Sequence, residues 1–142
     1  MGRALRREEG ASAVEMALIA PLLFMLVFGI IGFGLAFLQV QSIRTAVREG
    51  GRAAAVGAVR ADVQAKTVDA SSGSIPSANR GDVSVSYPRG ATNCNSNNIG
   101  DDVTVSFPTS VLNSGDGIVI RIPLFPDIHI TPTIEAQFRC EV

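Results

Sequence analysis

Two cysteines are the residues of this sequence best placed for a specific reaction, the formation of a disulfide bond. Cys94 lies in a segment rich in Asn, Ser and Gly, and Cys140 ends a segment in which apolar and polar residues alternate. The alternation places Cys140 on the inward face, and closing so long a loop would restrict the unfolded chain by about 4 kcal/mol. We therefore expect a Cys94–Cys140 bond, with two unrelated free thiols as the alternative. No metal site is expected, because neither cysteine has CxxC spacing or a nearby histidine.

Glu15 is the second residue of chemical interest, because it is a carboxylate near the start of an apolar segment. Every residue from Met16 to Leu38 is apolar or small. Such a run of about 23 residues can cross a hydrocarbon core roughly 30 Å thick, and it lacks the polar face of a soluble helix. We expect a membrane-inserted helix. A cleaved secretory signal peptide is the competing interpretation, but the run is long and no small-x-small site follows it.

The remaining composition argues against catalysis and nucleic-acid binding. The net charge is −1, which offers no basic surface to a phosphate backbone. The chain has no tryptophan, one tyrosine and one histidine, so it holds few of the residues that build cofactor pockets or act as acids and bases. His129, close to Asp127, is expected to be a surface or turn histidine. We expect neither an enzyme nor a cofactor, a metal ion, a nucleic acid or a small-molecule substrate.

The helical pattern continues beyond the apolar run as an amphipathic stem. Ile43 and Val47 are four residues apart and mark an apolar stripe on one side of that stem. The glycines at 50–51 weaken the prediction of an unbroken helix, and Gly57 is the expected hinge or end. A second short helix is predicted at about residues 58–69.

Beyond the linker at residues 71–81, the periodicity changes from helical to a two-residue alternation. Four strands are predicted, at residues 83–87, 103–107, 117–125 and 133–140. In the last, Ile134, Ala136, Phe138 and Cys140 share one face and the other face is polar. The fold class expected is α+β: a long N-terminal transmembrane and stem helix, a short second helix, and a small antiparallel sheet of about four strands. The apolar stripe of the stem is expected to pack against one face of that sheet.

Orientation in the membrane cannot be decided from the basic residues, since arginines lie on both sides of the apolar run. Three precede it and three follow it: Arg3, Arg6 and Arg7, then Arg44, Arg48 and Arg52. Disulfides persist outside a reducing cytoplasm, so the expected bond places the head outside and the N-terminus in the cytoplasm. We expect a single-pass protein of the inner (cytoplasmic) membrane.

The block GASAVEMALIAPLLFMLVFGIIGFG (10–34) resembles the N-terminal region of the TadE-like minor pilins of the Tad (tight adherence, Flp) pilus system. The resemblance continues through IRTAVREGGRAAAVG (43–57) and returns at FRCE (138–141). Met16 stands where that family usually has an aromatic residue. The resemblance covers the first part of the chain well and the head weakly.

The resemblance implies that a prepilin peptidase cuts after Gly10, which leaves Ala11 as the new N-terminus and Glu15 as the fifth residue. The chain would then divide into a leader peptide, a transmembrane and stem helix, and an α+β extracytoplasmic head, at residues 1–10, 11–57 and 58–142. The new α-amino group is cationic and would pair with the Glu15 carboxylate, which is costly to leave unpaired in an apolar segment. A glutamate that snorkels to the head groups is the alternative.

The function that the resemblance implies is that of a minor pilin or pseudopilin in an adhesive Tad/Flp pilus. Its partners would be other pilin subunits, the pilus assembly machinery, the prepilin peptidase and membrane lipid. The mature protein would reside in the membrane or in an extracellular pilus. The alternative is a membrane-anchored extracytoplasmic module for binding or adhesion that is not incorporated in a filament.

Overall fold

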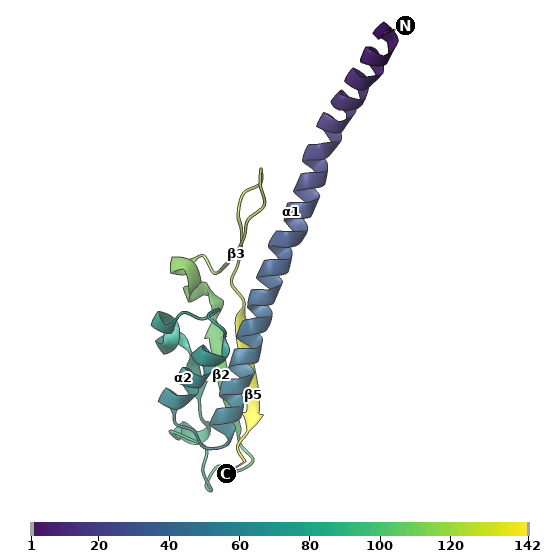
Figure 1. Ribbon diagram of the computed structural model, residues 1–142. Helices are drawn as coiled ribbons and strands as arrows, with labels where there is room; N and C mark the ends of the chain where they lie inside the picture. The colour runs from purple at the N-terminus through teal and green to yellow at the C-terminus, as the bar shows by residue number, and fades with distance from the viewer. Residues whose placement is uncertain (1, 142) are drawn as a thin grey trace.

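A computed structural model describes residues 2–141 of the chain, with side chains for residues 10–141. Met1, the first residue of the expected leader, lies outside the described part, as do the side chains of residues 2–9. One long helix, α1 (Gly2–Ala55), carries a small head around its C-terminal half, and its N-terminal half projects away from the head (Figure 1). The α+β class expected from the sequence is confirmed.

The head combines a second helix with five strands in the described residues. These elements are α2 (Arg60–Ala70), β1 (Ser84–Ser86), β2 (Asp102–Pro108), β3 (Ile118–Ile120), β4 (Ile128–Ile130) and β5 (Thr133–Arg139). Strand β2 is the centre of a three-stranded antiparallel sheet with the order β1-β2-β5. Strands β3 and β4 form a separate antiparallel pair.

This arrangement differs from the single four-stranded sheet that we expected. The apolar segment 117–125 contributes only Ile118–Ile120 as a strand, because a turn that includes Pro123 follows, closed by the Phe125 N–H on the Ile122 carbonyl. The segment then returns as β4, a strand that the sequence did not predict. Together β3 and β4 leave the sheet and extend along α1 (Figure 1).

The core lies between the sheet and the two helices. Strands β2 and β5 are in a register that pairs Val103 with Phe138, Val105 with Ala136, and Phe107 with Ile134. Val103, Val105 and Phe107 are fully buried. The alternate residues of β2 and β5 are exposed or half-buried, as the predicted alternation requires. The head therefore has two layers, with α1 and α2 on the apolar face of the sheet.

The stem half of α1 contributes a continuous stripe to this core. The buried residues Ala36, Ile43, Val47 and Ala54 lie four or seven positions apart, which places them on one side of a helix. The predicted stripe at Ile43 and Val47 is confirmed, since both side chains are fully buried.

The two adjacent glycines do not break α1. They lie where the helix approaches its neighbours most closely: a Cβ on Gly51 would be 2.5 Å from the Phe138 ring, and a Cβ on Gly50 would collide with Thr67 of α2. The helix instead ends at Ala55, and Gly57 adopts a φ of 92° just after it. Its N–H donates to Ala54 O (3.1 Å) and the following N–H donates to Ala53 O (3.1 Å), the hydrogen-bond pattern of a Schellman motif.

Candidate processing and assembly site

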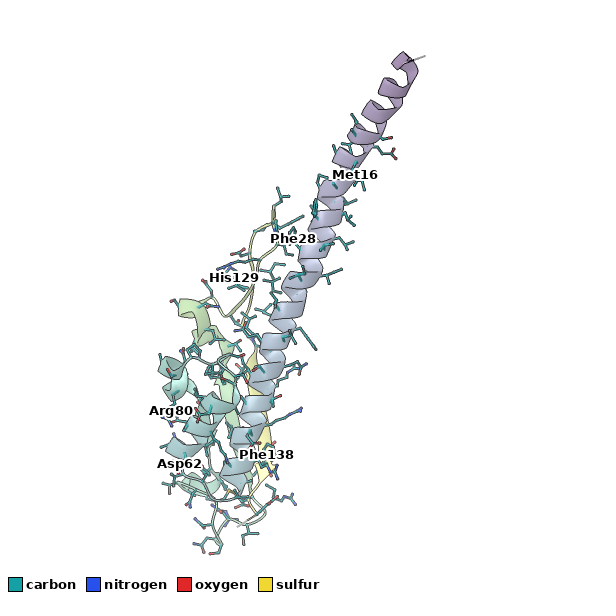
Figure 2. All side chains as sticks on the ribbon, viewed as in Figure 1. Met16, Phe28, Asp62, Arg80, His129 and Phe138 are labelled. Atoms are coloured by element: carbon teal, nitrogen blue, oxygen red, sulfur yellow. A yellow bond between two sulfur atoms is a disulfide. The ribbon has the colours of Figure 1, made fainter. Side chains whose placement is uncertain are left out.

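The N-terminal half of α1 is an apolar surface without a partner in the described chain. α1 is long enough and apolar enough to cross a membrane. No residue in its most apolar 18-residue window is buried. The side chains of Met16 and Phe28 radiate from the helix in Figure 2, and they are 67% and 45% exposed. Such a surface requires lipid or other apolar helices around it. It is therefore compatible with a single-pass membrane anchor.

The residues of the expected processing site lie on this projecting part of the helix. Gly10, Ala11 and Glu15 are all helical and exposed. Ala11 and Glu15 are four residues apart and so share one side of α1. The Gly10–Ala11 bond lies inside the helix, and glycine lowers helix stability by about 1 kcal/mol relative to alanine. The backbone at this bond is thus easier to unwind than it would be with alanine at position 10.

Glu15 lies next to the start of the apolar run on α1. Among the ion pairs of the described side chains, none involves Glu15. The leader arginines cannot be compared, because their side chains lie outside the described part.

The structure joins the two predicted cysteines. Cys94 and Cys140 form a disulfide with 5.4 Å between their Cα atoms, and both are buried. The strand side of the bond is held by two backbone hydrogen bonds: Cys140 N–H donates to Asp101 O (2.8 Å), and Gly100 N–H donates to Cys140 O (3.0 Å). The prediction of this pairing is confirmed.

Buried Asn98 shapes the loop on the other side of the disulfide. Its side-chain oxygen accepts the N–H of Asn95 at 2.7 Å, and its side-chain amide donates to Asn93 O at 3.1 Å. The loop around Cys94 is thus held by Asn side chains bonded to local backbone, as is common in turns. The sequence showed an Asn-rich loop, but it did not show which asparagine would be buried.

His129 and Asp127 do not form a pair. Instead, His129 Nδ1 lies 3.3 Å from the Asp116 carbonyl oxygen, and Asp127 faces Arg121 with 3.5 Å between Oδ2 and Nε. The side chain of His129 is 44% exposed, in agreement with the expected surface position. Within residues 10–141, no group of three His, Cys, Asp or Glu side chains is arranged to hold a metal ion.

The β3–β4 hairpin brings an unpredicted element beside α1. A Cβ on Gly32 would lie 3.1 Å from the carbonyl oxygen of Arg121, so the hairpin contacts the helix inside the apolar run. An apolar groove between hairpin and helix is lined by Phe33, Phe37, Ile120, Ile128 and other residues. Pro123 and Pro126, on either side of Leu124 and Phe125, are a turn signal that the predicted strand at 117–125 overlooked. Only the pairing of β3 with β4 places that turn next to α1.

These features define a class of protein in which one long apolar helix carries a disulfide-closed α+β head. Residues 10–52 match the family model described as "TadE-like protein". The match begins at Gly10, contains Glu15 and the apolar run, and ends in the stem, so it confirms the resemblance for the helix and leaves the head outside it. No curated protein and no solved structure matches the chain.

Proposed function

We propose that this chain is a minor pilin or pseudopilin that takes part in the assembly of a Tad/Flp-type adhesive pilus. The observation that carries the proposal is the unburied apolar half of α1, which coincides with the TadE-like match. The match supports a pilus-associated protein of the Tad system. The head leaves this apolar part of the helix uncovered. The helix can therefore reside in the membrane before assembly and pack against other pilin helices afterwards.

In this proposal a prepilin peptidase removes residues 1–10 at the cytoplasmic face of the membrane. Gly10 supplies the cleavage position and Ala11 the new amino terminus. Glu15 then lies one helical turn from that amino group, and the pair sets the axial position of one subunit against the next. Residues 11–57 act as the transmembrane and stem helix, and residues 58–142 form the extracytoplasmic head.

The disulfide supports this sidedness. A buried Cys94–Cys140 bond is expected in an oxidising compartment, which for a single-pass inner-membrane protein is the far side from the leader. The leader is then cytoplasmic and meets the peptidase, while the head faces the periplasm or the exterior. Mature subunits reside in the membrane or in an extracellular pilus.

Processing is the step to test. The full chain is expressed in membranes with and without a prepilin peptidase of a Tad system, and its intact mass is measured. We expect the peptidase to remove residues 1–10, Gly10→Val to block the removal, and Gly2→Val, a matched change in the same leader, to leave it intact. An unchanged mass, or equal processing of both variants, would contradict the proposal and favour an anchored binding module that does not enter a filament.

A further inference from the structure

The loop that joins β3 to β4 exposes two large apolar side chains. In this loop, called the hairpin tip and defined as residues 122–126, Leu124 is 87% exposed and Phe125 is 53% exposed. The hairpin extends away from the rest of the head along α1, toward the projecting half of the helix (Figure 1). Within the described part of the chain, both side chains therefore lack a cover.

The backbone holds Leu124 outward in an unfavourable conformation. Phe125 donates its N–H to Ile122 O at 3.1 Å, which closes a turn with Pro123 and Leu124 at its centre. Leu124 has a φ of 71°, in the left-handed region where such a turn normally has glycine or asparagine. Both the left-handed backbone conformation and the exposure of the side chain are unfavourable for a leucine. Unfavourable features of this kind concentrate at functional sites.

The position of the hairpin along α1 indicates the medium that the tip meets. Arg121, which precedes the tip, contacts Gly32 through its carbonyl oxygen. A helix rises about 1.5 Å per residue, so Gly32 lies about 9 Å inside the apolar run that ends at Leu38. In Figure 2 the hairpin that carries His129 continues toward the level of Phe28. A membrane that surrounds the apolar run therefore also reaches the tip.

The length of the helix, measured from the cytoplasmic end, gives a second and shallower depth. From Ala11 to Gly32, α1 measures about 32 Å. The hydrocarbon core of a bilayer is roughly 30 Å thick. With Ala11 at the cytoplasmic boundary, Gly32 and Arg121 lie at the outer boundary, and the tip lies just inside it.

The chemistry of the hairpin agrees with that depth. Arg121 and Asp127, which flank the tip, form an exposed ion pair that can remain among the lipid head groups. Pro123 and Pro126 have no N–H, and the N–H of Phe125 is already bonded within the turn. The tip therefore carries few unsatisfied donors into an apolar layer, where each unpaired backbone group is costly.

We infer that the hairpin tip inserts into the outer leaflet at the boundary of head groups and acyl chains, as a second membrane contact that fixes the head against the bilayer. The inference rests on the membrane insertion of α1 in the proposed function. A second copy of the chain is the other candidate cover, and the test separates the two.

The absence of tryptophan from the chain allows a direct measurement of depth. Three single-tryptophan variants of the full chain are reconstituted as monomers in nanodiscs with brominated or ordinary phospholipid. Phe125→Trp probes the tip, and Phe24→Trp probes α1. Ile99→Trp is the matched control, since Ile99 is 60% exposed and lies at the opposite end of the head, beside the C-terminal segment.

We expect bromine to remove most of the emission of the tip and α1 probes and to leave that of the Ile99 probe unchanged. Quenching at Phe24→Trp without quenching at Phe125→Trp would overturn the inference and leave the proposed function intact. A tip probe that becomes shielded only when two or more copies share one nanodisc would assign the tip to a second copy and also overturn the inference. Absence of quenching at both positions would refute membrane insertion of α1, and with it the inference.

Discussion

The backbone N–H of Glu141 donates to the carbonyl oxygen of Ala55 at 3.0 Å, so the end of the chain closes the end of α1. Cys140, the preceding residue, is bonded to Cys94. Nearby, Tyr87 donates its hydroxyl to Ala58 O. The last turn of the stem is thereby tied to both the sheet and the disulfide loop, and the head cannot swing freely on its helix.

The disulfide is expected to supply a large share of the stability of the head. Replacing Cys94 and Cys140 together by serine should lower the free energy of unfolding by about 2–5 kcal/mol, because the bond restricts the unfolded chain. Chemical denaturation of the detergent-solubilised protein measures the change. A reductant should destabilise the wild type equally and leave the double variant unaffected. Equal stability of oxidised and reduced wild type would contradict the prediction.

Gly51 is expected to be required for the packing of α1 on β5. Gly51→Ala places a methyl group 2.5 Å from the Phe138 ring, so the helix or the ring must move. Overpacking of this kind costs about 1–3 kcal/mol. Gly81→Ala is the matched control, because a Cβ there meets no atom within 4 Å. Thermal unfolding of both variants should show a loss only for Gly51→Ala, and equal melting temperatures would refute close packing at Gly51.

Tyr87 should make stability depend on pH in the alkaline range. Burial, the main cause, raises the pKa of Tyr87 above 10.0; Asp62 raises it further, and Arg60 acts in the opposite direction. The folded protein therefore holds the phenolic proton more tightly than the unfolded chain. Stability is fully present below pH 10.0 and falls as the pH rises through the higher folded pKa.

This tyrosine is the only one in the chain, so the phenolate absorbance reports its pKa without interference. Tyr87→Phe should remove the alkaline loss that comes from this group. The variant should also be less stable at neutral pH by about 1–3 kcal/mol, since Ala58 O loses its donor. A phenolate titration at or below the ordinary tyrosine value would contradict the expected shift.

Glu15 is expected to act in assembly rather than in folding. Glu15→Gln retains the size of the side chain and removes its charge, so pairing with the mature amino terminus is lost. We expect normal membrane insertion and a reduction on the order of tenfold in co-purification with other pilus subunits, equivalent to about 1.4 kcal/mol. Glu135→Gln, an exposed glutamate on the outer face of β5, is the control. Normal incorporation of Glu15→Gln would refute the assembly role, and Glu15 would then be only a carboxylate that reaches the lipid head groups.

Several features could be predicted from the sequence because they depend on neighbours along the chain. The apolar run that ends at Leu38 has the length and composition of a membrane-spanning helix whatever surrounds it. The inward residues of β5, including Ile134 and Phe138, follow from a two-residue period that any half-buried strand must have. The Cys94–Cys140 pairing followed because the chain has only two cysteines and one lay on that inward face.

The tertiary structure decided the features that depend on distant contacts. Local helix propensity indicated that α1 would be weak at Gly50 and Gly51. In the structure, Gly51 instead packs against Phe138, and the two glycines lie where α1 comes closest to its neighbours in the head. Likewise, the apolar segment 117–125 has the composition of one sheet strand. A turn ends that strand early, and the chain reverses to form a hairpin that contacts α1 at Gly32. Local sequence determines how a segment bends, whereas its partner is fixed by the packing of the whole chain.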